Sequence, residues 1–147
     1  MVLSCDCGFR EMIDMNKEAV NKLSILAIDD EPMMLRLIKQ ILERDNFEVN
    51  LASDGVSGLA VLEEKKPDLV LLDIMMPGMS GLEVLDKIRK TSDVPVIMVS
   101  ASPERISLEP ATDSGVDDYI TKPFHPAVLL ARVHAKLRRI EMEKAHK

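Results

Sequence analysis

Short apolar segments alternate with longer segments of helical periodicity along most of the chain. An apolar run between turn signals is typical of a strand buried on both faces, whereas recurrence every three or four residues is typical of a helix. The pattern therefore predicts strands and helices in strict alternation. The predicted strands are 23–28, 47–52, 69–72, 94–99 and 116–120.

Each predicted helix begins with residues that favour a helix start. Ser80 and Glu83 have the spacing of a capping box, in which each side chain bonds the backbone N–H of the other residue. The other starts are predicted at Pro32, 53–55, Ser102-Pro103 and Pro126. The apolar positions predict that the second helix buries Val56, Leu59 and Leu62, and that the last buries Leu130, Val133, Leu137 and Ile140.

Strict alternation of strand and helix predicts the α/β class. Right-handed crossovers between parallel strands place helices on both faces of the sheet. The economical arrangement at this length is a doubly wound, five-stranded parallel sheet with the flavodoxin-like order 2-1-3-4-5. We assign it to residues 23–141, after a leader of residues 1–22 that is poorly ordered or a short helix, and before a basic tail of residues 142–147.

Pro110 departs from this regular pattern. It lies inside the predicted fourth helix, which starts at Pro103. An interior proline removes a backbone donor and costs roughly 3 kcal/mol. We expect this helix to be short, bent or split.

Composition narrows the classes of partner. A chain of 147 residues suits one domain, and its net charge of −6 argues against direct binding of nucleic acid, although residues 132–147 are rich in Lys and Arg. No apolar run has the length of a membrane span, and the N-terminal segment lacks the apolar core of a secretory signal. Cys5 and Cys7, the two cysteines of the chain, lie in the leader, so we expect no disulfide bond to stabilise the fold. A fold without disulfides suits a reducing compartment, and we expect a cytoplasmic protein.

Charged and polar residues stand where the predicted strands end. Asp29 and Asp30 follow the first strand, Asp73 the third, Ser100 the fourth and Lys122 the fifth. In a doubly wound sheet these ends open on one edge, where ligands bind. Carboxylates crowded together need a cation, and an all-oxygen site suits Mg²⁺. Asp73 would keep an oxygen free to attack a phosphoryl group, so this edge predicts an aspartyl phosphate.

The sequence from Leu23 to about Arg139 resembles the receiver domain of two-component response regulators. Each of the motifs is weak alone, but together, at these spacings, they are specific to the family. The motifs are Asp29-Asp30, Asp73 with Met76-Pro77-Gly78 and Gly81, Ser100-Ala101, and Tyr119-Ile120-Thr121-Lys122-Pro123-Phe124.

The resemblance implies roles for the charged residues. Asp73 would be the phosphoacceptor, and Lys122 would pair with the phosphoryl oxygens. Mg²⁺ would be held by Asp30, Asp73 and the backbone carbonyl of Met75. Asp29 would assist through a water molecule.

The resemblance also implies a switch. Ser100 would be the switch hydroxyl, and Tyr119 would turn inward when Ser100 is drawn toward the phosphoryl group. The Lys122–Pro123 peptide bond would be cis, as in the family. The face formed by the fourth helix, the fifth strand and the fifth helix would report phosphorylation to partners.

The implied function is signalling. A histidine kinase or phosphotransfer protein would donate the phosphoryl group, and phosphorylation would alter the binding of a downstream target protein or a covalently linked output domain. The domain would catalyse only its own phosphorylation and dephosphorylation, so we do not expect a turnover enzyme. About ten residues follow the last family position, which suggests a stand-alone receiver or a module excised from a larger multidomain signalling protein.

Three alternatives are weighed against this function. A phosphatase of the haloacid-dehalogenase type needs a second Asp two residues after the nucleophile, where this chain has Met75. A flavin- or dinucleotide-binding module needs a glycine- or hydroxyl-rich turn after the first strand to bind phosphate, where this chain has residues 29–32, Asp-Asp-Glu-Pro. A phosphorylation-independent interaction module on the same fold is the third alternative, although all the site residues are present.

Overall fold

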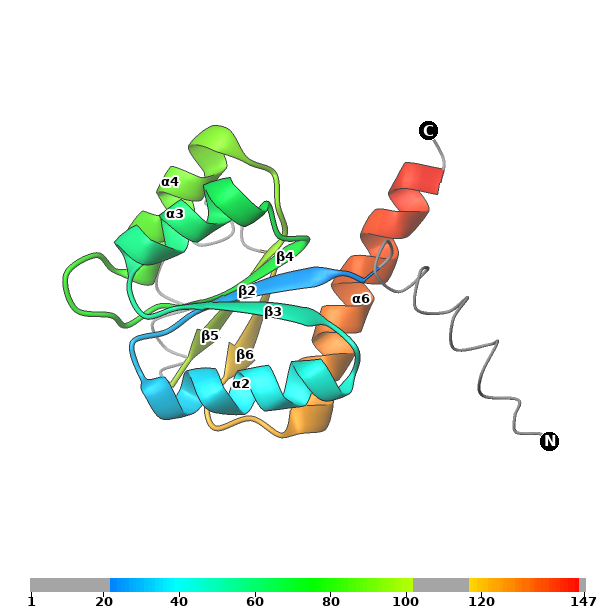
Figure 1. The fold of residues 1–147 in the computed structure, drawn as a ribbon, viewed down its shortest axis with the longest axis horizontal. Coiled ribbons are helices and arrows are strands. Elements are labelled where there is room, and N and C mark those ends of the chain that lie inside the picture. Colours follow the sequence, from blue (N-terminus) through cyan, green and yellow to red (C-terminus); the bar gives the residue numbers. More distant parts are fainter. Residues whose placement is uncertain (1–21, 102–116, 146–147) are drawn as a thin grey trace.

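Five parallel strands form one sheet in the computed structural model of the protein, which describes residues 22–101 and 117–145 (Figure 1). The strands are β2 (Ser24–Ile28), β3 (Glu48–Ala52), β4 (Leu69–Asp73), β5 (Val96–Ser100) and β6 (Asp118–Thr121). They lie in the order β3-β2-β4-β5-β6, and each neighbouring pair is parallel. This is the predicted order 2-1-3-4-5, so the doubly wound fold is confirmed.

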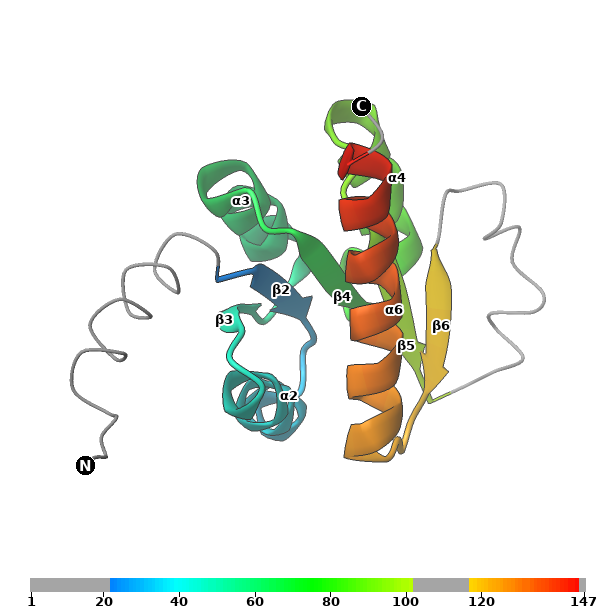
Figure 2. The same cartoon turned by 90° about the vertical axis from the view of Figure 1, so that its right-hand side faces the viewer.

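Two helices cover each face of the sheet in the described part of the chain. The helices α2 (Pro32–Arg44) and α6 (Pro126–Ala145) lie on one face, and α3 (Gly55–Lys65) and α4 (Gly81–Thr91) on the other (Figures 1 and 2). The last helix continues to Ala145, into the segment that we assign to the tail. Outside the described residues lie the leader up to residue 21, with its two cysteines, and the predicted helix that starts at Ser102-Pro103 and contains Pro110.

The helix starts follow the sequence closely. The predicted capping box is present: the Ser80 hydroxyl accepts from the N–H of Glu83 at 3.3 Å, and the Glu83 carboxylate accepts from the N–H of Ser80 at 3.0 Å. Asp54 caps α3 in the same way by accepting from the N–H of Ser57 at 2.8 Å. The helix α2 begins at Pro32 as predicted, where the missing N–H leaves no donor unsatisfied.

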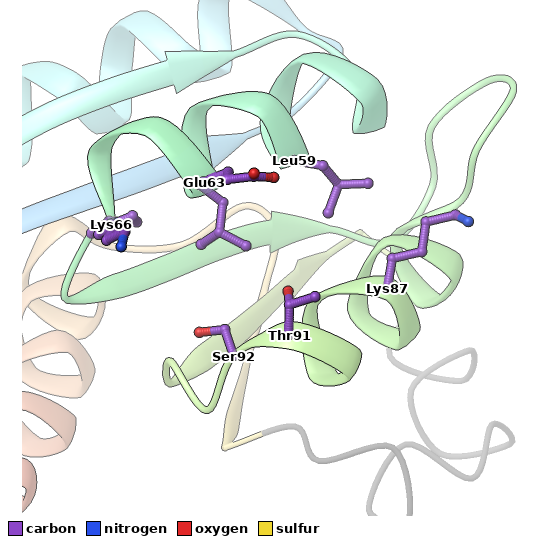
Figure 3. Close-up of a pocket in the computed structure, with 8 residues that line it drawn as sticks. Leu59, Glu63, Lys66, Lys87, Thr91 and Ser92 are labelled. Atoms are coloured by element: carbon purple, nitrogen blue, oxygen red, sulfur yellow. The ribbon is translucent and has the colours of Figure 1, made fainter.

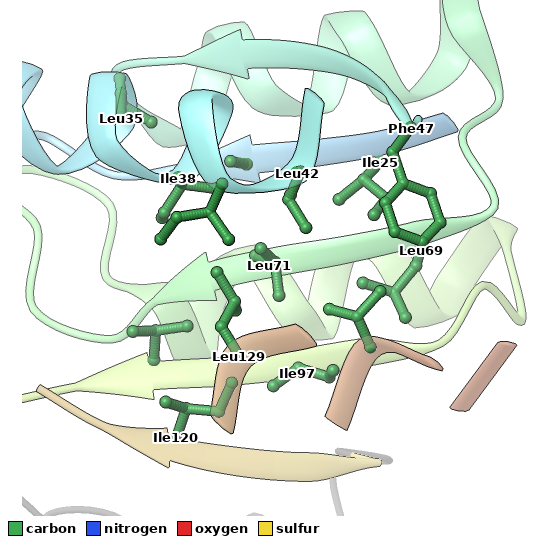
Figure 4. Close-up of a cluster of buried hydrophobic side chains, with 14 of the residues drawn as sticks. Ile25, Leu35, Ile38, Leu42, Phe47, Leu69, Leu71, Ile97, Ile120 and Leu129 are labelled. Carbon is green, nitrogen blue, oxygen red and sulfur yellow. The ribbon is translucent and has the colours of Figure 1, made fainter. Parts of the chain in front are cut away.

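Apolar cores lie on both faces of the sheet. Toward α2 and α6, the central strands contribute Ile25, Leu71 and Ile97 (Figure 4). Toward α3 and α4, the same strands contribute Leu26, Leu72 and Met98. Because successive residues enter opposite cores, β2, β4 and β5 are buried on both sides, and their carboxyl ends are held in fixed positions.

Two helices bury residues other than those the apolar pattern predicts. Val56 is 69% exposed, whereas Gly58 faces the sheet so closely that a Cβ atom there would lie 2.5 Å from Cδ1 of Ile28. In α6, Leu129 is fully buried and Leu130 is buried only in part. The pattern misses the rotation of α3 because a glycine contributes no side chain to the count of apolar positions.

The start of α4 lies directly against the end of β4. The N–H of Gly81 donates to the carbonyl of Ile74 at 2.8 Å. A Cβ atom at residue 81 would lie 2.2 Å from the carbonyl oxygen of Asp73, far inside van der Waals contact. The space at this position therefore admits only glycine, which lets α4 support the backbone that carries Asp73.

Replacing Gly81 with alanine should lower the free energy of unfolding by about 3 kcal/mol, the upper range for an overpacked site. The methyl group can be accommodated only by displacing backbone at Asp73. Gly78→Ala is the control, because nothing lies within 4 Å of its Cβ position and the substitution costs only the strain of a φ of +82°. That strain is roughly 1–2 kcal/mol. Urea unfolding measures both, and equal losses would contradict the steric explanation.

Candidate functional site

The carboxyl ends of four neighbouring strands, β2, β4, β5 and β6, meet at one edge of the sheet. Asp29 follows β2, while Asp73 and Ser100 are the last residues of β4 and β5. Ser100 pairs with Thr121 of β6, and the N–H of Lys122 donates to the carbonyl of Ser100 at 2.8 Å. The fold therefore brings these predicted site residues to one edge, as the sequence predicts.

The three predicted aspartates form a compact cluster. One carboxylate oxygen from each of Asp29, Asp30 and Asp73 lies within 4.8 Å of the other two. Asp29 and Asp73 are 2% and 5% exposed, and Asp30 is half-buried. Negative charges this close in a poorly hydrated place repel one another strongly unless cations balance them. An all-oxygen donor set of this kind fits Mg²⁺, the predicted metal.

Lys122 supplies a positive charge within this cluster. Its ammonium donates to Asp29 Oδ2 at 2.8 Å and lies 3.4 Å from Asp73 Oδ1. It also donates to Glu31 Oε1 at 3.4 Å, and the lysine side chain is only 9% exposed. Burial alone would lower the pKa of Lys122, but its hydrogen bond to Asp29 and the surrounding carboxylates outweigh burial and raise the pKa above its ordinary value.

The surroundings of Asp73 change the pKa of its carboxyl group. Burial raises the pKa of Asp73 to about 6, and repulsion from Asp29 contributes to the rise. Attraction and hydrogen bonding from Lys122, with a smaller contribution from the backbone N–H of Met75, act in the opposite direction. Desolvation and the crowding of like charges therefore outweigh the single ammonium at this carboxylate.

The predicted switch residues lie beside the cluster. Ser100 is fully buried at the end of β5. Tyr119, on the adjacent strand β6, is half-buried and packs against the core beneath α3 and α4. The side chain of Met75 is 51% exposed, which is compatible with a role for its backbone alone. The Lys122–Pro123 peptide bond is cis, as predicted.

Glu31 is a member of the site that the sequence analysis misses. Its position directly after the Asp29-Asp30 pair is the one signal in the sequence, and acidic residues before a helix have an ordinary explanation in the helix dipole. The structure shows instead that its carboxylate reaches Lys122, from a segment 91 residues away along the chain.

A separate cavity of about 590 Å³ lies at the opposite end of the sheet, between the C-terminal ends of α3 and α4 (Figure 3). Leu59, Glu63, Lys66, Lys87, Thr91 and Ser92 are among the residues that line it. It contains none of the predicted site residues.

Among the described helices, none combines the length and apolar character that crossing a membrane requires.

The fold and the charged edge together define a class of protein, the doubly wound α/β domains with a carboxylate cluster at the ends of parallel strands. The chain belongs to the response regulator receiver domain family, whose sequence model matches residues 25–134. The predicted family is confirmed.

Solved structures and curated proteins agree with this assignment. The crystal structure of a CheY-like response regulator receiver domain protein from Methanospirillum hungatei JF-1 is 36% identical with a TM-score of 0.77, and the match covers 84% of this chain and 99% of that one. The receiver domain of NtrX from Brucella abortus is 34% identical with a TM-score of 0.73, over 78% of this chain and 98% of that one.

Two curated relatives are longer proteins. The DNA-binding response regulator MtrA of Mycolicibacterium smegmatis is 41% identical over 121 residues, which is 82% of this chain and 53% of that protein. The transcriptional regulatory protein CseB of Streptomyces avermitilis is 44% identical over 115 residues, which is 78% of this chain and 49% of that protein. The chain thus spans about half the length of the curated relatives it matches.

These names bear on the expectation that the domain does not touch nucleic acid. One relative is named as DNA-binding and the other as a transcriptional regulator. Both names disagree mildly with the expectation that nucleic acid is not a direct partner. Because the match covers about half of each, their names describe more than the part that resembles this chain. The absence of direct nucleic-acid contact stays a prediction for the receiver domain.

Replacing Asp73 with asparagine should stabilise the protein when divalent cations are absent. Since the pKa of Asp73 is raised from 3.8 to about 6, its ionised form lowers stability in full above about pH 6, and this loss fades as the pH falls toward 4. We expect a gain of about 1–3 kcal/mol near pH 7.5 and almost none near pH 4, measured by urea unfolding in EDTA. Asp93→Asn, at an exposed site, is the control. A loss of stability in Asp73→Asn would contradict the charge-crowding argument.

Proposed function

We propose that the protein is a phosphorylation switch in which Asp73 accepts a phosphoryl group. The observation that carries the proposal is the arrangement of charge at the sheet edge: three aspartates whose oxygens lie within 4.8 Å, with the ammonium of Lys122 3.4 Å from Asp73. A strand buried along its whole length presents Asp73 to this edge. Membership of the receiver family supports the same function.

The donor set is suited to Mg²⁺. The aspartate cluster supplies only oxygen ligands, and among the described residues the ammonium of Lys122 balances only part of its negative charge. Asp30, Asp73 and the backbone carbonyl of Met75 would hold the ion, with Asp29 assisting through a water molecule. When bound, Mg²⁺ would neutralise part of the charge on the transferring phosphoryl oxygens.

Asp73 would act as the nucleophile. One of its carboxylate oxygens forms a bond to phosphorus while the bond between phosphorus and the imidazole nitrogen of a donor phosphohistidine breaks. The electron pair of the broken bond leaves with the imidazole, which then takes up a proton from water. Lys122 donates to a phosphoryl oxygen and neutralises charge there. Attack of water on phosphorus later returns the Asp73 carboxylate and releases inorganic phosphate, so the domain catalyses only its own modification and its reversal.

Ser100 and Tyr119 would couple the chemistry to a change of surface. The Ser100 hydroxyl, at the end of β5, donates to a phosphoryl oxygen and moves toward it. Tyr119 lies on β6, the strand paired with β5, where it is half-buried. Its inward turn would change the face that partners read.

A histidine kinase or a histidine phosphotransfer protein would supply the phosphoryl group in the cytoplasm. The output would be a target protein or a covalently linked domain. The name of MtrA as a DNA-binding response regulator favours an output that binds DNA, with the receiver acting on it and not on the DNA. The net charge of −6 supports this arrangement, because a negatively charged chain is repelled by the phosphates of DNA.

Incubation with Mg²⁺ and acetyl phosphate should add the mass of one phosphoryl group to the protein. The gain should disappear in EDTA and in Asp73→Ala, because the first removes the metal and the second the nucleophile. Intact-protein mass spectrometry measures the adduct, and circular dichroism checks that the variant is folded. A folded wild-type protein without any gain would favour the phosphorylation-independent interaction module.

Asp30→Asn should weaken Mg²⁺ binding by about tenfold or more, since it removes a charged oxygen ligand from the cluster. Isothermal titration calorimetry measures the affinity without reference to phosphorylation. Asp54→Asn is the matched control, because Asp54 caps α3 and takes no part in the cluster. An unchanged affinity in Asp30→Asn would exclude Asp30 as a ligand.

A further inference from the structure

Within residues 22–101 and 117–145, three carboxylates are partners of the Lys122 ammonium. It lies 2.8 Å from Asp29 Oδ2, 3.4 Å from Asp73 Oδ1 and 3.4 Å from Glu31 Oε1. An ammonium carries three N–H donors and no more. Two of these donors bond Asp29 and Glu31, and Asp73 pairs with the same ammonium. A phosphoryl oxygen that approaches Lys122 therefore competes with carboxylates that already surround it.

The three partners differ sharply in exposure. The side chains of Asp29 and Asp73 are 3% and 5% exposed, whereas that of Glu31 is 63% exposed. Separating a buried ion pair leaves charge in a poorly hydrated place, while an exposed carboxylate regains its hydration as it leaves. Glu31 is thus the partner that Lys122 releases at the smallest free-energy cost.

The backbone places Glu31 for this contact. Its N–H donates to Asp29 Oδ1 at 2.9 Å, and Asp29 Oδ2 accepts from Lys122 at 2.8 Å. Asp29 therefore fixes both the turn that carries Glu31 and the ammonium that Glu31 reaches. Glu31 occupies the N-cap position of α2 but makes no side-chain capping bond, so its carboxylate serves Lys122 and not the helix.

We infer that Glu31 is a positioning residue, which engages one donor of Lys122 in the unphosphorylated protein and yields that donor to a phosphoryl oxygen when Asp73 is modified. The inference rests on the proposed phosphorylation of Asp73. It adds that the carboxylate of Glu31 competes with the phosphoryl group for an N–H donor of Lys122.

This role has a distinct kinetic consequence. Glu31 stabilises Lys122 only while Asp73 is unmodified, so it raises the barrier to phosphorylation. In the phosphorylated protein Glu31 has already withdrawn, so it affects hydrolysis little. A residue that merely supported the structure of the site would alter both rates.

Two variants of Glu31 and one control distinguish the contact with Lys122 from the negative charge of Glu31. Glu31→Gln removes the charge, and Glu31→Asp keeps it on a side chain one methylene shorter, at an N-cap position where Asp bonds the helix N-terminus instead. Glu43→Gln is the matched control, because it removes an exposed carboxylate from the same helix at its far end. Each is incubated with Mg²⁺ and acetyl phosphate, and mass spectrometry follows formation and hydrolysis of the adduct.

Glu31→Gln and Glu31→Asp should both form the adduct about two- to fivefold faster than Glu43→Gln, the range expected for loss of an exposed ion pair. Hydrolysis should stay at the wild-type rate in all three. Beryllofluoride, a phosphoryl mimic that transfers nothing, should bind both Glu31 variants tighter by the same factor in an NMR titration with Mg²⁺.

Other outcomes would overturn the inference. Acceleration in Glu31→Gln alone, with Glu31→Asp like the wild type, would mean that Glu31 acts by repelling the anionic donor. Slower formation, an unchanged rate or an equal change in hydrolysis would exclude the exchange of partners. A wild-type protein that forms no adduct would instead refute the phosphorylation of Asp73 itself, so the two failures are distinguishable.

Discussion

The ion pair between Lys122 and the aspartates is the interaction on which the functional edge depends. It joins residues from the ends of β2, β4 and β6, which lie far apart in the sequence, and it is almost completely buried. Burial makes each charge interaction strong, both the attraction to the ammonium and the repulsion among the carboxylates. In the described part of the chain, one ammonium lies among three aspartates, which leaves excess negative charge at the edge and favours a cation there. Burial is the larger cause of the raised pKa of Asp73, and repulsion from Asp29 adds to it.

The two apolar cores prevent the chain from relieving this repulsion. The central strands are buried on both faces, and α4 packs so closely on the end of β4 that only hydrogen fits at the α-carbon of Gly81. The carboxylates therefore cannot separate without disturbing the packing that stabilises the whole domain. The free energy gained by packing in the two cores offsets the repulsion among the carboxylates at the edge. Functional sites commonly depend on the rest of the fold in this way.

The fold and most of the site could be predicted because each depends on local pattern. Apolar runs identified the strands, and residues just after them became neighbours once the strands were parallel. Glu31 could not be predicted, since its contact with Lys122 depends on the path of the turn after β2 and on a bond from its own N–H to Asp29. The predicted burial of Val56 was wrong for a related reason. The orientation of α3 is set by the close approach of Gly58 to Ile28, and a glycine adds nothing to a hydrophobic pattern.

The proposed phosphorylation of Asp73 would make opposite demands on Lys122. Its ammonium needs partners before a phosphoryl group arrives, because an unpaired buried charge is strongly destabilising. It would also have to exchange a partner, because a phosphoryl oxygen competes with the carboxylates already around the ammonium for its three donors. The buried side chains of Asp29 and Asp73 would meet the first demand, and Glu31, which is mostly exposed, would meet the second. The graded burial of these partners is a property of the folded chain, and it allows a site built from like charges to be both stable and exchangeable.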